Sequence, residues 1–475
     1  MTMPKPEARL PPGTSSFLSG ASENFSFHSS PESFIISRIL QYHKDRPEEV
    51  DKRTTVRAKI LNRNVAVVSS YEQIKQVLEP SDGTVKENQQ PPYVATAPYN
   101  RLMEPFFPPP NLLLKDGCPH QKSKDQWRQL IQPLSNQTVQ EQTRTSISSF
   151  LQRVPLDAPL DLYATCKDLG WQIFLSTFLD IEPQTAEYNE VEKLQEDLLR
   201  GQFSLFPVTV NTGFWHSPRK VGIDARKKLQ AFIEKRLDTR RPAWLNAQAL
   251  SKEAREEKVN HLLMSTSSLA VKSFASLMTA LLLNIFVFKG KQSGESVARQ
   301  IASCSQEERD EQRKAVMKET LRLSPPIVGI MRRTTQQRTL HNSDPNEPDV
   351  LVPEGWDVWP YFPGGNRDVA VFGSDADDFD PARYLKGKES LPEPIAFGLG
   401  NKRCLGQSFV EHAVLAVLEA FEKQGLNLQG TVEAAGVRAW LGWERDDPGV
   451  WAKDMKQLPS QHPAQPIMAR FSKQA

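Results

Sequence analysis

A single cysteine in a glycine-rich, basic stretch constrains this 475-residue chain more than any other feature. The stretch runs Phe397-Gly398-Leu399-Gly400-Asn401-Lys402-Arg403-Cys404-Leu405-Gly406. Its glycines let the backbone turn tightly and approach a flat ligand closely, and Lys402 and Arg403 add positive potential that favours a thiolate. Helical periodicity from Gln407 to Glu422 puts Cys404 just before a helix N-terminus, where an anion is stabilised. Cys404 is therefore predicted to be either a nucleophile or a metal ligand.

Composition limits the classes of function open to this chain. Lysine and arginine number 59 and aspartate and glutamate 57, a net charge of +2, so composition gives no reason to expect a nucleic-acid partner. The four cysteines, at positions 118, 166, 304 and 404, are too widely spaced for a zinc site. So few cysteines in a chain of this length indicate a reducing, cytoplasmic compartment.

The N-terminal residues Met1 to Gly13 are polar and proline-rich, without the apolar core of a signal peptide or anchor. The apolar run Leu281 to Phe288 is too short to cross a bilayer, which needs about 20 residues. We expect residues 1–30 to form a flexible lead without a membrane anchor. Residues 31–475 are expected to form one domain, soluble or peripherally associated with a membrane.

Hydrophobic periodicity predicts a mainly α fold with a smaller β-rich part. Helices are expected at 31–46, 71–78 and 260–288, and a hairpin at 55–70 that turns around Asn62-Arg63-Asn64. Residues 122–323 are mostly helical in pattern, whereas prolines, glycines and strand-like pieces dominate 325–399. The proline-rich stretch 91–119 is expected to be irregular, and an irregular stretch of this length is often functional.

The cysteine stretch resembles the heme-binding loop of the cytochrome P-450 superfamily, Phe-x-x-Gly-x-x-x-Cys-x-Gly, which Phe397, Gly400, Cys404 and Gly406 fill. Further motifs of that superfamily precede it in the expected order. They are Glu-x-x-Arg at Glu319 and Arg322, Asn366-Arg367-Asp368, and Asp380-Pro381-Ala382-Arg383-Tyr384.

The resemblance implies a single large heme domain with heme b held by Cys404 as the axial thiolate. The loop positions implied to contact the cofactor are Phe397, Gly398, Gly400, Lys402, Cys404 and Gly406. Glu319 and Arg322, which share a helix face, are implied to form a structural cluster with Arg383. This cluster would lock the scaffold behind the heme.

The two propionates of heme require cations. Lys402 stands where the family usually has arginine or histidine. His120, Lys124 and Arg128 recur at four-residue spacing, so they are expected on one helix face, with His120 and Arg128 favoured as propionate partners. Of Arg332 and Arg333 only one is expected to point inward, and we expect Arg333 to be the one that contacts a propionate.

The chain departs from the family in its central helix. Oxygen-activating members carry an acid followed by threonine, which relay protons to bound dioxygen. Counting back from Asn284 puts Ser268 at the acid position and Leu269 at the threonine position, and no acid lies between Asn260 and Lys289. The serines of this segment either order a water or hydrogen-bond to their own helix.

This departure favours oxygen-independent rearrangement or dehydration, or peroxide-using chemistry, with Cys404, Ser268 and Leu269 as catalytic positions. Branches of the family that isomerise or dehydrate lipid peroxides, such as allene oxide synthase and prostacyclin synthase, also lack the relay. Asn401-Lys402 matches the allene oxide synthase branch, but that branch's elongated cysteine loop is absent. The alternatives are a monooxygenase that uses dioxygen and a reductase, and a non-catalytic heme sensor.

The substrate is expected to be a lipophilic small molecule bound by a monomeric protein. The candidate pocket residues implied by the family are Phe106, Phe107, Phe206, Met264, Leu269, Ile327, Val328 and Ile330.

Overall fold

The computed structural model describes most of the chain, and all structural statements below concern the described residues. These are residues 7–13, 23, 26, 31–42, 54–60, 63–80, 90–204, 216–239, 252–287, 297–385, 391–430, 455–456, 460–463 and 466–473.

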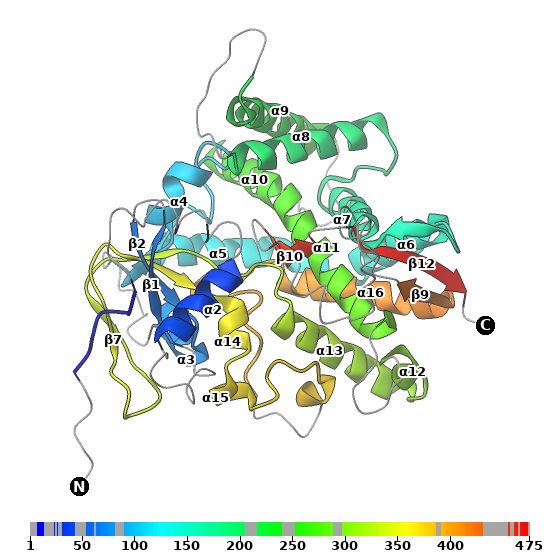
Figure 1. Ribbon diagram of the computed structural model, residues 1–475. Helices are drawn as coiled ribbons and strands as arrows, with labels where there is room; N and C mark the ends of the chain where they lie inside the picture. Colours follow the sequence, from blue (N-terminus) through cyan, green and yellow to red (C-terminus); the bar gives the residue numbers. More distant parts are fainter. Residues whose placement is uncertain are drawn as a thin grey trace.

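Helices make up the larger part of the molecule, to the right of the main sheet in Figure 1. The long helices are α5 (Gly117–Ile131), α6 (Gln137–Arg153), α7 (Leu162–Leu179), α8 (Ala186–Gln202), α9 (Pro218–Thr239), α10 (Lys252–Ser265), α11 (Ser268–Leu282), α13 (Gln306–Leu323) and α16 (Gln407–Lys423). The shorter elements are α2 (Pro31–Tyr42), α3 (Tyr71–Leu78), α4 (Thr96–Met103), α12 (Val297–Ala302), α14 (Phe362–Asn366), α15 (Val369–Phe372) and the π-helix η3 (Leu283–Val287). Three 3₁₀ turns complete the set: η2 (Gln132–Ser135), η4 (Pro381–Tyr384) and η5 (Gly400–Lys402).

The helical core centres on the contact between α7 and α11. Helix α7 is apolar around most of its circumference, as expected of a helix surrounded by protein. Gly170 allows the close approach, because a Cβ there would lie 3.2 Å from the side chains of Phe274 and Val271. Phe174 and Phe274 meet edge to face, with centroids 5.9 Å apart.

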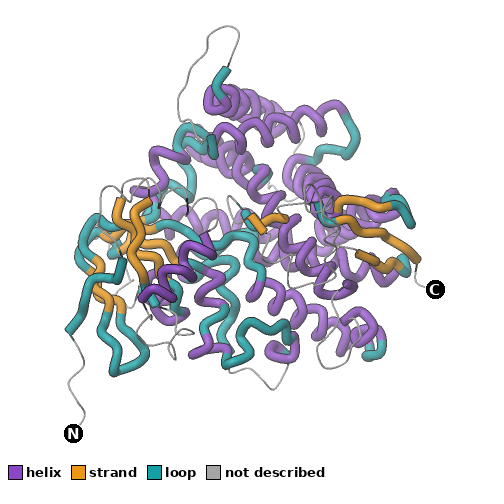
Figure 2. Tube along the Cα trace, viewed as in Figure 1, coloured by secondary structure: helices purple, strands orange, loops and turns teal. Residues whose placement is uncertain are grey.

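Most strands lie in a larger group on the left of Figure 2 or in a smaller group near the C-terminus, and a short strand piece lies between the two groups. The main sheet has the order β1 (Val56–Ile60), β2 (Arg63–Val68), β8 (Asp357–Pro360), β5 (Arg332–Thr334) and β3 (Tyr93–Val94). A second sheet orders β4 (Pro159–Asp161), β12 (Met468–Lys473) and β9 (Leu426–Gly430). Two-stranded ladders pair β6 (Arg338–Leu340) with β7 (Val350–Val352), and β10 (Met455–Lys456) with β11 (His462–Pro463).

Strand β2 is buried on both faces, which explains its run of consecutive apolar residues. Ala66 and Val68 belong to one apolar cluster, whereas Val65 and Val67 belong to another on the opposite face. The predicted hairpin is present, with β1 and β2 antiparallel and Ile60 opposite Arg63. The mainly α fold with a smaller β part is confirmed.

The expectation that 91–119 is irregular was wrong, and part of the expected lead is hydrogen-bonded to the sheets. The stretch 91–119 contains α4 and the first turn of α5. Residues 7–13 of the expected lead lie along the sheets: Leu351 N donates to Arg9 O at 2.7 Å, and Arg57 N to Pro12 O at 2.7 Å.

The central helix is interrupted, although its apolar pattern predicts one continuous element. Helix α10 ends at Ser265, and Ser267 adopts extended backbone angles and caps α11 by accepting a hydrogen bond from Ala270 N at 3.3 Å. Among the described residues, one helical stretch, Ala254–Val287, is long and apolar enough to span a membrane. Because 72% of its most apolar window is buried within the protein, it also fits a core helix.

Candidate functional site

The cysteine loop is a closed turn packed against the end of α3. Cys404 N donates to Phe397 O at 2.8 Å, and Gly398 and Gly400 have φ of 71° and 62°, the left-handed region that favours glycine. A Cβ at Gly400 would lie 2.4 Å from Leu78 O. Gly400 is therefore required for packing of the loop on α3, and its contact with a cofactor stays a prediction.

The Cys404 thiol is exposed on one side and enclosed by protein on the others. Its side chain is accessible to solvent, yet burial raises the pKa of the thiol above its ordinary value. The backbone N–H groups of Gly406 and Gln407, with Lys124 and Arg403, act in the opposite direction. A Cβ at Gly406 would meet no protein atom within 4 Å. The sulfur is thus aimed by two amides at an open space, the environment that a metal-bound thiolate requires.

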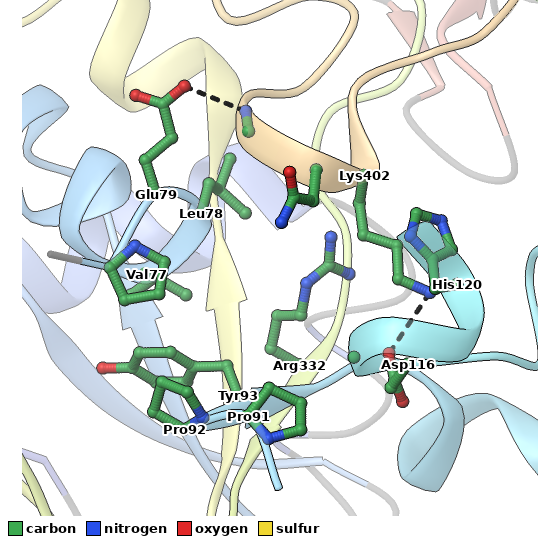
Figure 3. Close-up of a pocket in the computed structure, with 14 residues that line it drawn as sticks. Val77, Leu78, Glu79, Pro91, Pro92, Tyr93, Asp116, His120, Arg332 and Lys402 are labelled. Carbon is green, nitrogen blue, oxygen red and sulfur yellow. Dashed lines mark hydrogen bonds and ion pairs between the residues drawn. The ribbon is translucent and has the colours of Figure 1, made fainter. Parts of the chain in front are cut away.

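A cluster of cations lies beside the loop, around a cavity of about 320 Å³. Figure 3 shows Lys402 of the loop, Arg332 of β5 and His120 of α5 gathered at this cavity. Lys402 Nζ is 3.2 Å from Asp116 Oδ1, and burial lowers the pKa of Lys402 to about 8.

The groups that shift the pKa of His120 show that positive charge exceeds negative charge in this cluster. Its side chain is buried, and burial, together with the charges of Lys402 and Lys124, lowers its pKa to about 3. Among the groups that act on His120 most strongly, Lys402, Lys124 and Arg332 are cations and Asp116 is the one carboxylate. An excess of buried cations near an open thiol fits a ligand that carries two carboxylates, as heme does.

Lys124 has a different role from the one its charge predicts. Its Nζ donates to the backbone oxygens of Asn401 at 2.5 Å and Arg403 at 2.7 Å. The lysine therefore fixes the shape of the cysteine loop from α5. Burial lowers its pKa to about 8.

The structure does not bring Arg128 or Arg333 to the cluster, and both predictions were wrong. Arg128 is 53% exposed and pairs with Asp125, because each four-residue step advances the position by about 40° around a helix and Arg128 has turned off the buried face. Arg333 binds Asp357 with Nε at 2.8 Å and Nη2 at 2.7 Å. Side chains alternate along β5, so Arg332 is the one that lines the cavity.

The structure brings together Glu319, Arg322 and Arg383 in the protein interior. Arg322 donates to both carboxylate oxygens of Glu319, at 2.8 and 2.7 Å, and both side chains are 0% exposed. Arg383 Nε lies 3.6 Å from Glu319. Arg322 also donates to Asn366 O at 2.8 Å, and the Asn366 side chain accepts from Ile395 N at 2.8 Å. These bonds connect the buried ion cluster to the segment that leads into the cysteine loop.

Ser268 and Leu269 lie at the start of α11, where the central helix is interrupted. Ser268 is 1% exposed, and its Oγ donates to Glu196 Oε1 of α8 at 2.9 Å. The sequence analysis missed Glu196, since 72 residues separate it from Ser268 and no local pattern relates them. Leu269 is partly buried.

The predicted pocket residues do not form one group. Phe106 and Phe107 are buried in the helical core, and Phe106 lies between Gly201 of α8 and Gly222 of α9. Val328 and Ile330 pack in the two clusters on either face of the sheet. None of these four residues lines the cavity beside the cysteine loop, so their assignment to a substrate pocket stays a prediction. The remaining candidates are Met264, Leu269 and Ile327, which are partly buried, and Phe206, which lies outside the described residues.

Comparison with known proteins relates this chain to one family. The family model "Cytochrome P450" matches residues 313–421. Cytochrome P450 26A1 of Xenopus laevis is 25% identical over 306 residues, 58% of this chain and 59% of that protein. Cytochrome P450 714A2 of Arabidopsis thaliana is 35% identical over 98 residues, 20% of this chain and 17% of that protein. The matched region thus spans less than two thirds of each relative.

Solved structures match over nearly the whole chain. The retinoic acid-bound cyanobacterial CYP120A1 has a TM-score of 0.67 at 16% identity, covering 99% of this chain and 100% of that one. A six-coordinated cytochrome P450 from Thermus thermophilus has a TM-score of 0.62 at 17% identity, covering 92% and 98%. The family model over residues 313–421 and the curated relatives support membership of the cytochrome P450 superfamily, whose members hold heme through a cysteine thiolate. The solved structures show the fold of that superfamily over nearly the whole chain.

Proposed function

We propose that this protein is a heme-thiolate monooxygenase that oxidises a lipophilic small molecule with dioxygen and electrons from a reductase. The observation that carries the proposal is the Cys404 thiol, aimed by two backbone amides and flanked by a buried cluster of cations. When bound, a thiolate-ligated heme supplies oxidation chemistry in which the sulfur favours cleavage of an O–O bond.

The residues around the site have separate tasks. The N–H groups of Gly406 and Gln407 stabilise charge on Sγ, and Lys124 fixes the loop that carries it. His120, Arg332 and Lys402 would hold the two carboxylates of the cofactor. Met264 and Leu269, partly buried on the central helix, would present an apolar surface to the substrate and exclude water.

We propose dioxygen-dependent rather than redox-neutral chemistry because of a contact at the start of α11. Oxygen-independent chemistry was expected because no acid occurs between Asn260 and Lys289. Glu196 nevertheless reaches Ser268 from another helix, so a carboxylate does contact the position that the sequence leaves without one. The related cytochromes P450, among them 26A1 of Xenopus laevis, support the same choice.

The substrate class follows from the apolar central helix and from one structural neighbour. CYP120A1 binds retinoic acid, and an elongated apolar carboxylic acid is therefore the first compound to test. We further propose a cytoplasmic monomer, soluble or in peripheral contact with a membrane, that receives electrons from a separate reductase.

Stoichiometry tests the proposed reaction. The purified holoenzyme, supplied with a reductase, reduced nicotinamide cofactor and candidate acids, should consume dioxygen in proportion to oxidised product. Turnover of a lipid hydroperoxide at full rate without reductase or dioxygen, and none with them, would overturn the proposal.

A second candidate function, oxygen-independent or peroxide-using chemistry, is supported by a specific observation. The central helix itself carries no acid from Asn260 to Lys289, which favours rearrangement, dehydration or peroxide use. The same stoichiometry experiment separates this candidate from the first, because it predicts product without consumption of reductant.

A further inference from the structure

Residues 110–116, which we call the strap, connect helix α10 with the cysteine loop. The strap begins in a turn of its own: Asn111 Nδ2 donates to Phe107 O at 2.8 Å, and Asn111 Oδ1 accepts from Leu114 N at 3.0 Å. The leucines at positions 112–114 are only partly buried against the helical core. Because little apolar surface holds the strap, the polar contacts at its two ends decide how firmly it is held.

Helix α10 holds the first end of the strap through consecutive side chains. Asn260 Nδ2 donates to Pro110 O at 3.3 Å, and His261 Nε2 accepts from Leu112 N at 3.2 Å. The His261 side chain is buried, and its ring lies against Trp127 of α5 with centroids 4.2 Å apart. The ring that accepts from the strap is therefore fixed in place by another helix.

A further contact at this end is an ion pair close to the surface. Lys115 Nζ donates to Glu257 Oε1 of α10 at 2.8 Å and to Ser123 Oγ of α5 at 2.6 Å. The side chains of Lys115 and Glu257 are 23% and 18% exposed. The pair can therefore separate into water at a lower cost than a fully buried pair.

The opposite end of the strap is fixed to the cysteine loop and forms a wall of the site. Lys402 Nζ donates to Lys115 O and lies 3.2 Å from Asp116 Oδ1, as Figure 3 shows for Asp116. Asp116 also accepts from Ala95 N at 3.0 Å and from Thr96 N at 2.9 Å. Asp116 lines the cavity that holds the cation cluster. One end of the strap thus belongs to the site, and the other is attached to the central helix.

The two ends differ in what they lose when they open. At the cysteine loop, Asp116 serves two backbone amides and an ammonium group, which would all lose an acceptor together. At α10, single hydrogen bonds hold the strap at separate points. We propose that the strap swings away from α10 to let heme enter and leave the site, and that its contacts with α10 keep the loaded site closed. This inference requires heme at Cys404 but no particular reaction, so it goes beyond the proposed function.

A gate and a residue that binds the cofactor have different kinetic signatures. If heme passes only while the strap is open, weaker contacts with α10 raise the open fraction equally with and without heme. Uptake and release then accelerate by the same factor, and the affinity for heme does not change. Loss of a side chain that holds the cofactor instead accelerates release and lowers the affinity.

The test starts from the heme-loaded full chain and measures two quantities. One is the rate of heme transfer to excess apomyoglobin, and the other is the equilibrium partition of heme when apomyoglobin is limiting. Lys115→Met and His261→Phe should each transfer heme about 3- to 10-fold faster, the factor that one hydrogen bond contributes, with an unchanged partition. Arg128→Met, which removes an exposed cation of α5, should match the wild type in both. Lys402→Met should transfer heme faster and also shift the partition toward apomyoglobin.

Hydrogen exchange gives a second readout that does not depend on heme transfer. In heme-loaded Lys115→Met, the Leu112 amide, which donates to His261, should exchange faster by the same factor as heme transfer. The Cys404 amide, which donates to Phe397 O, should exchange as in the wild type.

Two results would overturn the gate. One is faster transfer in Lys115→Met and His261→Phe with the partition shifted toward apomyoglobin, because the strap would then bind the cofactor and not gate it. The other is a wild-type transfer rate in both variants. A full chain that takes up no heme would overturn the assignment of Cys404 as the iron ligand, and the gate with it.

Discussion

The surroundings of Cys404 and the surroundings of Ser268 are built in different ways. At Cys404 the essential groups are neighbours in sequence: the thiol, the amides of Gly406 and Gln407, and Lys402 lie within a few residues. At Ser268 the polar partner comes from Glu196 on another helix. A site made of local backbone geometry can be recognised from one stretch of sequence, whereas a site made of contacts between helices cannot.

The largest expected effect is a loss of stability when the buried ion cluster behind the cysteine loop is broken. Glu319→Gln leaves Arg322 charged and fully buried without its partner, and removal of one member of a buried ion pair costs about 3–5 kcal/mol. Chemical denaturation should show this loss of stability, accompanied by loss of heme.

The adjacent surface pair provides the control. Lys318→Ala breaks a pair with Glu393 whose side chains are 36% and 52% exposed, and should cost less than about 1 kcal/mol. Equal effects of the two substitutions would show that the loop does not depend on the buried cluster.

A smaller effect is expected for Gly400→Ala. Left-handed backbone costs a residue with a Cβ about 1–2 kcal/mol, and here the Cβ would also lie 2.4 Å from Leu78 O. Gly425→Ala, with φ of 57° but no atom within 4 Å of its Cβ, isolates the backbone cost. Denaturation midpoints should fall more for Gly400→Ala, and an equal fall would contradict the proposed packing of the loop on α3.

The cation cluster is tested by heme retention. Lys402→Met should accelerate transfer of heme to an acceptor protein about 10-fold or more, since a charged hydrogen bond contributes about 1.5–3 kcal/mol. Arg128→Met removes an exposed arginine of α5 and should leave the rate unchanged. A faster heme transfer in Arg128→Met than in Lys402→Met would contradict this account and support Arg128 as a propionate partner, as helical spacing predicted.

The smallest effect concerns a contact between the segment before α5 and α10. His261, whose Nε2 lies 3.6 Å from Glu257 Oε1, and Lys115, whose Nζ donates to the same oxygen at 2.8 Å, lower the pKa of Glu257 to about 2, below the ordinary value of 4.5. Because the folded-state pKa is depressed, this group stabilises the protein fully above pH 4.5, and that contribution is lost as the pH falls toward 2. Glu257→Gln should flatten the pH dependence of the melting temperature in this window.

The neighbouring Glu256, which is exposed, is the matched control for this titration. Glu256→Gln should leave the pH dependence as it is in the wild type. If both variants behave alike, the contacts of Glu257 with His261 and Lys115 do not contribute to stability.

Sequence alone predicted the parts of the molecule whose cause is local. The α3 helix, the β1–β2 hairpin and the cysteine loop follow from periodicity and glycine placement. Glu319 and Arg322 follow from helical spacing, and the structure also brings Arg383 to them. Helical spacing failed for Arg128, because small angular steps accumulate over two turns. The ion pair of Arg333 with Asp357 and the hydrogen bond between Glu196 and Ser268 join segments that are distant in sequence. No local pattern therefore predicts them.

The most direct test of the account is the reduced carbon monoxide spectrum of the heme-loaded protein. Wild type and Cys304→Ser, which changes a cysteine outside the loop, should both give the absorption band typical of thiolate-ligated heme. Cys404→Ser should lose that band together with turnover. An unchanged band and unchanged turnover in Cys404→Ser would contradict the assignment of sulfur at position 404 as the iron ligand.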